Sequence, residues 1–152
     1  MFIRAARPEE ANQLSELALA SKAYWDYTPE FIAACRDDLT LTPADLTTTY
    51  TVYLAEAEDR LLGFYALGPV EQGGAEIAYF FISPDAIGQG IGRLLFQHLQ
   101  AQARQQDYTF LQTDSDPNAQ AFYEAMGMIC LGQVESTVSK GRFLPLMHME
   151  LD

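Results

Sequence analysis

The sequence predicts an α/β or α+β fold, because segments with the composition of strands alternate with segments that repeat apolar residues at helical spacing. The clearest unit runs from residue 75 to residue 113 and reads as an apolar strand, a helix and a second strand. Such a unit forms a parallel pair of strands joined by a right-handed crossover. The chain has 152 residues, enough for one domain with a sizeable core, and we expect residues 1–152 to form that single domain.

The first half of the chain supplies three predicted strands and two helices. Phe2–Ala5 reads as an opening strand, and Pro29 as the start of a short second helix. Residues 50–56 and 61–67 are rich in strand-forming residues, with AEDR between them as a hairpin turn. The first helix follows Pro8, and its apolar stripe consists of Ala11, Leu14, Leu17, Ala18 and Ser21.

The central unit begins with the strongest strand of the chain, residues 75–82. It is apolar on both faces near its end, as a central strand should be. Residues 108–113 alternate like a strand. The helix between the two has apolar residues at helical spacing, namely Ile91, Leu94, Leu95, Leu99 and Ala103.

The last part of the chain predicts one helix and two strands. Asp116 suits a helix cap, Pro117 the first helical position and Gly127 the stop. Strands follow over residues 128–135 and 142–151.

Charge and composition limit the classes of partner. The formal net charge is −12 and no cluster of Lys and Arg occurs, which argues against nucleic acid as a partner. The same charge favours a cationic partner, but taken alone it is better explained by solubility. The longest apolar run, Ile77–Ile82, is too short to span a membrane, and the N-terminus lacks the apolar segment of a signal peptide. Cys35 and Cys130 show neither metal-ligand spacing nor disulfide density. We therefore expect a cytoplasmic protein that binds no metal and no membrane.

Three glycines stand at alternate positions where the central strand gives way to its helix: Gly88, Gly90 and Gly92. The first amides of a helix lack partners and carry the positive end of the helix dipole, so such a turn can bind phosphate. Glycine permits unusual backbone angles and a close approach of the ligand. The spacing is neither that of a dinucleotide fingerprint nor that of an NTPase phosphate loop. The alternative is a purely structural tight turn.

These residues resemble a motif of the GNAT superfamily of acetyl-CoA-dependent N-acetyltransferases. The family pattern is Arg/Gln-x-x-Gly-x-Gly/Ala after a strand that ends in apolar-x-Pro. Here Ile82-Ser83-Pro84 is followed by IGQGIG (87–92), with Ile87 in place of the usual Arg or Gln. A second family segment is similar to DPNAQAFYEAMGM (116–128), in which Met128 replaces phenylalanine. The closing GRFLPLMHMEL also resembles the family's last strand, so the resemblance extends over nearly the whole chain.

The resemblance implies the fold and the cosubstrate site. It implies a mixed sheet of six to seven strands, flanked by about four helices, in which the fourth and fifth strands splay apart. The pantetheine arm of acetyl-CoA would enter the gap and bond to the backbone of the fourth strand, as an added strand would. The residues implied to bind acetyl-CoA are Phe80, Phe81 and Ile82 on that strand, the amides of Gly88, Gly90, Ile91, Gly92 and Arg93, and Asn118.

The resemblance also implies transfer of the acetyl group to a primary amine by direct attack in a ternary complex. Tyr123 matches the family tyrosine near the cofactor sulfur, where a phenol can donate to the departing thiolate. Glu76, at the start of the central strand, is our candidate base, acting directly or through water, and Tyr79 is a second candidate. His98 and His148 fall in no family motif, and we expect them to be structural.

The acceptor side is expected after the first helix. Trp25 and Tyr27, beside Asp26, can hold a cationic amine by cation–π contact and charge, or else plug the sheet. The acceptor stays open between a small molecule and a protein amine, and the oligomeric state between a monomer and a homodimer. Two other functions also stay open. One is a regulatory module of the same fold that binds acetyl-CoA without catalysis, and the other is an acyltransferase for longer acyl groups.

Overall fold

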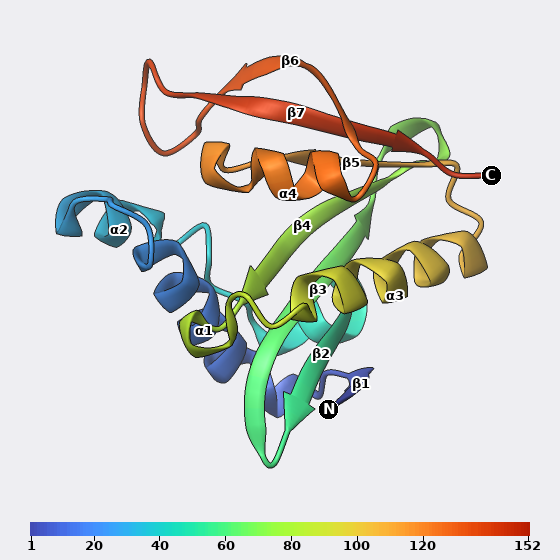
Figure 1. Ribbon diagram of the computed structural model, residues 1–152, viewed down its shortest axis with the longest axis horizontal. Coiled ribbons are helices and arrows are strands. Elements are labelled where there is room, and N and C mark those ends of the chain that lie inside the picture. The colour runs from blue at the N-terminus through green and yellow to red at the C-terminus, as the bar shows by residue number, and fades with distance from the viewer.

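The computed structural model describes residues 1–152, and one seven-stranded sheet joins strands from both ends of the chain (Figure 1). The strand order is β1-β2-β3-β4-β5-β7-β6, and every neighbouring pair is antiparallel except β4 and β5. The strands are β1 (Phe2–Ala5), β2 (Thr51–Ala57), β3 (Arg60–Pro69), β4 (Ala75–Ile82), β5 (Phe110–Asp114), β6 (Ile129–Glu135) and β7 (Phe143–Glu150). The α-helices are α1 (Ala11–Ala23), α2 (Pro29–Cys35), α3 (Ile91–Gln105) and α4 (Gln120–Ala125).

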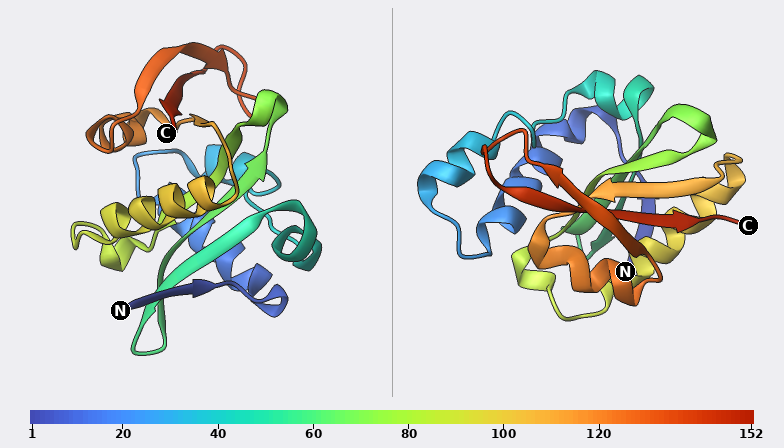
Figure 2. Two further views of the ribbon diagram at one scale, coloured as in Figure 1. Left: turned by 90° about the vertical axis from the view of Figure 1, so that its right-hand side faces the viewer. Right: turned by 90° about the horizontal axis from the view of Figure 1, so that it is seen from above.

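Helices cover both faces of the sheet, α1 on one and α3 with α4 on the other (Figures 1 and 2). Alternation along β3 divides its side chains between the two layers: Phe64 packs in the core under α1, and Tyr65 in the core under α3. Both side chains are fully buried. The central part of the sheet is thus apolar on both faces, as the sequence predicted for residues 75–82. None of the helices combines the length and the apolar character needed to cross a membrane.

The predicted helical stripes are confirmed in α1 and wrong at one position in α3. All five stripe residues of α1 are buried. In α3, Leu94 is 44% exposed, whereas Phe96, which the stripe omitted, is 1% exposed. Each residue of a helix turns by about 100°, so Leu94 and Phe96 lie on opposite flanks of the line through Leu95 and Leu99. The neighbouring α4 covers the Phe96 flank, where Phe122 and Tyr123 pack against its ring.

The predicted hairpin between β2 and β3 is confirmed and closes through a two-residue turn. Glu58 and Asp59 both have positive φ, of 52° and 61°, as the turn type that matches the twist of a hairpin requires.

A bulge in β4 changes which side chains face which layer. Ala66 pairs with Tyr79 and Leu67 pairs with Ile77, so Ala78 has no partner on β3. As a result Ile77 packs in the core under α3, and Tyr79, two residues later, packs in the core under α1.

The parallel pair β4–β5 separates almost as soon as it forms. Only two residue pairs join the strands, Ala75 with Leu111 and Glu76 with Gln112. Beyond them β5 continues to pair with β7 as far as Asp114, while β4 continues to pair with β3 as far as Ile82. The splayed fourth and fifth strands implied by the resemblance are therefore present.

Candidate active site

A cleft of about 670 Å³ opens where β4 and β5 separate. Ile77–Ile82 of β4 bounds one side, with Tyr79 alone turned away from it, and Thr113–Asp116 bounds the other. Backbone groups of a strand alternate between its two edges, so half of those in Ile77–Ile82 face the cleft instead of β3. This open strand edge is the one on which the family resemblance places the backbone contacts of Phe80, Phe81 and Ile82.

The glycine turn forms the cleft wall at the N-terminus of α3. Gly88 and Gly90 have φ of +86° and +80°, and a Cβ atom added at either would meet nothing within 4 Å. Their open sides therefore leave room for a ligand, and their backbone angles favour glycine over any other residue. Gly92 has a different role, because a Cβ there would lie 3.0 Å from the ring of Phe122, which would have to shift by a few tenths of an ångström.

The amides of this turn are free to bind an anion. No acceptor in the chain takes a hydrogen bond from the backbone N–H of Gly88, Gly90, Ile91, Gly92 or Arg93, and all five residues line the cleft. The positive end of the α3 dipole points in the same direction. The Arg93 side chain is exposed and makes no ion pair, so it can add a charge to this anion site. Ile87 also lines the cleft, 38% exposed, and offers an apolar surface where the family has Arg or Gln.

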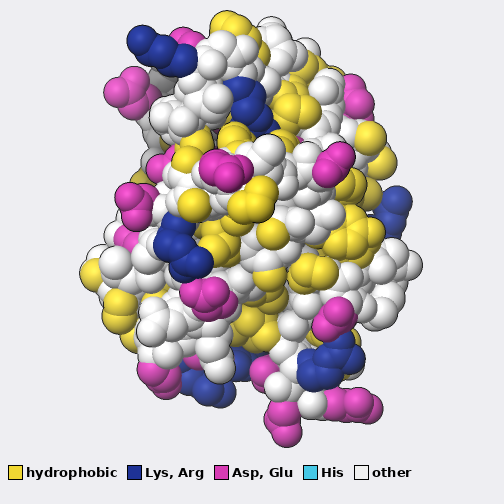
Figure 3. Space-filling model, turned by 90° about the vertical axis from the view of Figure 1, so that its left-hand side faces the viewer, with side chains coloured by type: hydrophobic (Ala, Val, Ile, Leu, Met, Phe, Trp, Pro, Cys, Tyr) yellow, Lys and Arg dark blue, Asp and Glu magenta, His cyan; other side chains and the backbone are white.

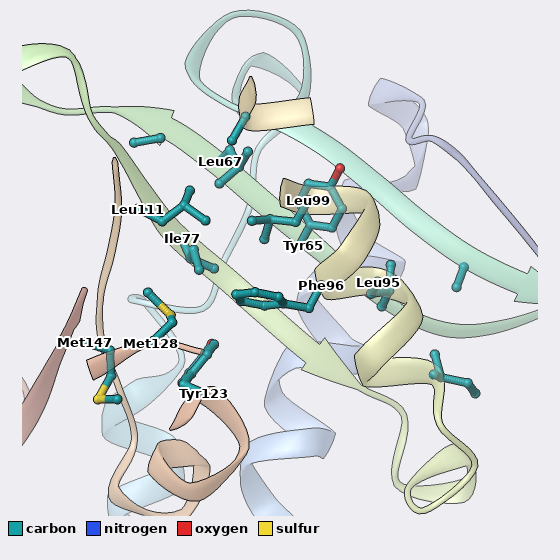
Figure 4. Close-up of a cluster of buried hydrophobic side chains, with 14 of the residues drawn as sticks. Tyr65, Leu67, Ile77, Leu95, Phe96, Leu99, Leu111, Tyr123, Met128 and Met147 are labelled. Carbon is teal, nitrogen blue, oxygen red and sulfur yellow. The ribbon is translucent and has the colours of Figure 1, made fainter. Parts of the chain in front are cut away.

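Tyr123 brings a phenol into the cleft from α4. Its side chain is only 5% exposed and packs near Met128 and Met147 in the core (Figure 4). Its hydroxyl makes no hydrogen bond within the protein, yet the residue lines the cleft. Burial, with a smaller contribution from Asp116, raises the pKa of Tyr123 well above its ordinary value. The phenol therefore keeps its proton at neutral pH and is available as a donor.

Glu76 lies at the start of β4, between Gly68 on β3 and Gln112 on β5. Burial raises the pKa of this carboxyl, and the nearby Asp114 raises it further, as suits a group that must take up a proton. Glu76 does not line the cleft, although Ile77, the next residue, does. The second candidate base, Tyr79, donates its hydroxyl to the carbonyl oxygen of Asp38 at 3.0 Å and does not line the cleft either.

The predicted acceptor residues are divided between the cleft and its surroundings. Trp25 lines the cleft and is 40% exposed. The hydroxyl of Tyr27 is held by Asp116 at 2.8 Å, just outside the cleft lining. Asp26 is exposed and does not line the cleft. Figure 3 looks onto the side where α2, the turn before α3 and the β6–β7 loop lie, and apolar side chains reach the surface there between acidic and basic ones.

Other cleft residues were missed by the sequence reasoning. Lys22, at the end of α1, lines the cleft and pairs with Asp116 at 2.6 Å. Asp38 and Asp114 also line it, and neither forms an ion pair. Asp116 was visible in the sequence only as a helix cap, a role confirmed by its bond from the Asn118 amide. Lys22 carried no local signal at all.

Both histidines lie outside the cleft. Nδ1 of His98 is 2.7 Å from the hydroxyl of Tyr65, and Nε2 of His148 is 2.6 Å from a carboxylate oxygen of Glu150.

Comparison with known proteins gives one family. A model of the acetyltransferase (GNAT) family matches residues 17–128. The 5-NmdU N-acetyltransferase of Pseudomonas phage PaMx11 is 26% identical over 134 residues, which cover 88% of this chain and 90% of that protein.

Solved structures share the fold over almost the whole chain. A GCN5-related N-acetyltransferase from Rhodopseudomonas palustris has a TM-score of 0.80 at 21% identity, with 99% of this chain and 95% of that chain covered. The PaiA N-acetyltransferase from Thermoplasma acidophilum, solved in complex with coenzyme A, has a TM-score of 0.77 at 16% identity, with 98% of each chain covered.

The matched segment contains the glycine turn, the β4–β5 opening and Tyr123. The resemblance read from the sequence is thereby confirmed, and so is the expectation of an enzyme. The chain belongs to the acetyltransferase (GNAT) family and is an acyltransferase.

Proposed function

We propose that this chain moves the acetyl group of acetyl-CoA to a primary amine by direct attack in a ternary complex, with residues 1–152 as one catalytic domain. One observation carries the proposal: a turn of unpaired amides and a tyrosine hydroxyl without a partner line the same cleft. The PaiA neighbour was solved with coenzyme A, and the phage relative is an N-acetyltransferase, which supports both substrates.

Two parts of the cleft match two chemically different parts of acetyl-CoA, its pyrophosphate and its pantetheine arm. The amides from Gly88 to Arg93 would hold the pyrophosphate without a basic side chain, and Arg93 would add its charge. The free edge at Phe80–Ile82 would pair with the amide groups of the pantetheine arm. Asn118, which lines the cleft at the start of the α4 segment, would contact the same cosubstrate.

Tyr123 is proposed as the acid. When the amine nitrogen bonds to the acetyl carbon, the bond from that carbon to sulfur breaks, and the sulfur leaves with the bonding electrons. The Tyr123 hydroxyl would donate its hydrogen bond, and then its proton, to that sulfur. A backbone N–H on the free edge of β4 would stabilise the charge that develops on the acetyl oxygen.

Glu76 is proposed as the base. An amine attacks only when neutral, so one proton has to leave the substrate ammonium before or during the reaction. Because Glu76 lies beside the cleft and not in its lining, it would receive this proton through water.

The acceptor end of the cleft favours an ammonium group. Asp38 and Asp114 line the cleft without ion pairs, whereas Lys22 is paired with Asp116, which also pairs with Arg142. Trp25 offers an aromatic face for cation–π contact. Asp26, exposed next to Trp25, remains a predicted anchor for a longer cationic acceptor.

Thermal unfolding with saturating acetyl-CoA tests the cosubstrate first, with NAD and ATP as controls. A ligand at a hundred times its dissociation constant adds about 2.7 kcal/mol of stability. We expect this stabilisation with acetyl-CoA alone. No shift with acetyl-CoA, or an equal shift with NAD or ATP, would contradict the assignment of the cleft.

Release of the coenzyme A thiol then tests the acceptor. We would compare butylamine, diaminobutane and aminobutanoate, which share a reacting amine and differ in the charge at the far end, together with 5-NmdU. The acidic acceptor end predicts that kcat/KM is highest for diaminobutane and lowest for aminobutanoate. Absence of thiol release with every amine would overturn the proposed transfer.

A further inference from the structure

A cluster of polar side chains at the cleft joins three segments that are distant in the sequence. It consists of Lys22 from α1, Tyr27 from the loop before α2, Asp116 and Asn118 from the β5–α4 turn, and Arg142 from the β6–β7 loop. We call these five residues the Asp116 cluster. It contains two of the nine Lys and Arg residues of the chain, in a protein whose net charge is −12.

The two carboxylate oxygens of Asp116 have separate partners. Oδ2 accepts from Lys22 Nζ at 2.6 Å and from the Tyr27 hydroxyl at 2.8 Å, and Arg142 lies 3.4 Å from it. Oδ1 accepts from the backbone N–H of Asn118 at 2.8 Å and from its side-chain amide at 3.0 Å. One carboxylate thus binds the α1–α2 segment with one oxygen and the turn that leads into α4 with the other.

The Tyr27 hydroxyl is the centre of the same cluster. It donates to Asp116 and accepts from Arg142 at 2.8 Å and from the Asn118 side chain at 3.1 Å, so every hydrogen-bonding position of the oxygen is used. Burial, followed by the bond to Asp116, raises the pKa of Tyr27, and the hydroxyl stays protonated. No donor or acceptor on this oxygen is left for a substrate.

The aromatic rings complete the connection between the segments. Tyr27 packs on Phe31 with ring centroids 4.6 Å apart. Lys22 Nζ lies 5.4 Å from the Tyr27 centroid, and the Arg142 guanidinium lies 4.9 Å from the Phe31 centroid. These distances are within the range of cation–π attraction.

The cluster joins residues with different roles in the proposed reaction. Lys22, Trp25, Asn118 and Tyr123 all line the cleft. Under the proposed function, Lys22 and Trp25 form its acceptor wall, and Asn118 and Tyr123 contact the cosubstrate. Asn118 begins the segment that carries Tyr123 five residues later.

Building on the proposed function, we infer that Asp116 is a positioning residue. We also infer that Tyr27 connects Asp116 to Arg142 and does not contact the substrate. Together with Arg142 they hold the acceptor wall at a fixed distance from Asn118 and Tyr123. Reacting atoms have to be held about 3 Å apart and aligned, and a misplacement of about 1 Å can cost a hundredfold in rate, so a looser wall lowers the rate for every acceptor alike.

The test is Tyr27→Phe, which keeps the ring and its packing and removes only the hydroxyl. Tyr24→Phe is the matched control, because Tyr24 is 52% exposed, does not line the cleft and makes no hydrogen bond through its hydroxyl. Steady-state kinetics with each active amine would be measured where both variants are fully folded, together with calorimetric binding of coenzyme A and the Tm.

We expect Tyr27→Phe to lower kcat/KM for the acceptor on the order of tenfold, by the same factor for each amine, and to leave the Kd of coenzyme A unchanged. Arg142→Met should have a similar effect. The double variant should lose little more kcat/KM than either single variant, because both substitutions break the same hydrogen bond between Arg142 and Tyr27. Tyr24→Phe should behave like the wild type.

Three results would overturn the inference. The first is that Tyr27→Phe has the same kcat/KM as Tyr24→Phe. The second is a loss of kcat/KM that differs between amines, as a direct contact with the substrate would produce. The third is a loss of kcat/KM that is explained by a lowered Tm alone. Asp116→Asn is expected to lose more, and if it fails to fold, the Tyr27 and Arg142 variants still decide. A wild type inactive with all amines would instead contradict the proposed function itself.

Discussion

The hydroxyl of Thr113 on β5 donates a hydrogen bond of 2.9 Å to the carbonyl oxygen of Ile77 on β4. This bond lies one residue beyond the last backbone pair of the two strands, Glu76 with Gln112. Both residues are buried, and both line the cleft. The side chain of Thr113 thus closes the inner end of the cleft where backbone pairing stops.

Replacement of this hydroxyl by a methyl group should destabilise the fold. Thr113→Val keeps the shape of the side chain and leaves the buried Ile77 carbonyl without its donor, at an expected cost of about 1–2 kcal/mol in the free energy of unfolding. Urea unfolding measures this loss. Thr109→Val is the control, because its hydroxyl bonds to Gly73 in an exposed position and should matter by less than about 0.5 kcal/mol. Equal losses in the two variants would contradict the assignment.

Tyr123→Phe separates catalysis from folding and binding. The hydroxyl has no partner within the protein, so its removal should leave the Tm and the Kd of coenzyme A close to those of the wild type. If Tyr123 is the acid, kcat should fall by about a hundredfold or more. Thiol release at saturating substrates gives kcat. An undiminished kcat would remove Tyr123 from the mechanism.

Glu76→Gln should change the pH dependence of activity without a loss of stability. The carboxyl has a raised pKa in the folded state, so its contribution to stability is largest below pH 4.5 and is lost as the pH rises through the folded value. At neutral pH the variant should therefore be at least as stable as the wild type. The acidic limb of kcat/KM, set by a pKa above 4.5, should disappear, and the rate should fall.

Profiles of kcat/KM against pH, with the exposed Glu71→Gln as control, decide this assignment. An acidic limb that persists in Glu76→Gln would point to a different base.

Gly90→Ala tests the amide turn. At a φ of +80° an alanine is strained by about 1–2 kcal/mol, and its methyl group would occupy the open side of the turn. Gly73, with a φ of +84° at the β3–β4 connection, is a matched control for strain, because a Cβ there makes only ordinary contact with Thr109. Both variants should lose similar stability in urea, and only Gly90→Ala should weaken acetyl-CoA binding in calorimetry. Equal affinities would argue that this turn is purely structural.

His98 should make the fold sensitive to acid. Burial lowers the pKa of the ring, which contacts the buried Tyr65, so the neutral form is favoured in the folded state. Stability is then fully present above the unfolded pKa of about 6.5 and is lost as the pH falls toward the lower folded value. The stability difference between wild type and His98→Gln should shrink over that interval. Urea unfolding of the two proteins at several pH values across that interval measures this difference.

The sequence by itself determined the features that depend on local pattern. The stripe of α1, the two-residue turn at Glu58 and Asp59, and the cap at Asp116 each follow from residues a few positions apart, whose spacing fixes which side chains share a face. The turn before α3 is local in the same sense, because alternate glycines at a helix start leave amides both unpaired and accessible. The family motifs overlap two of these segments, the cap at Asp116 and the glycine turn before α3.

Only the tertiary structure decided the extent of the cleft and the composition of its acceptor end. The point where β4 leaves β5 depends on the continued pairing of β5 with β7, and the bulge at Ala78 depends on the register with β3. Lys22 and Asp116 are 94 positions apart, and Tyr27 and Arg142 are 115 apart. Periodicity along a chain reports which face a residue takes, and it contains no information on which distant segments meet. That choice is made when the two core layers and the sheet pack together.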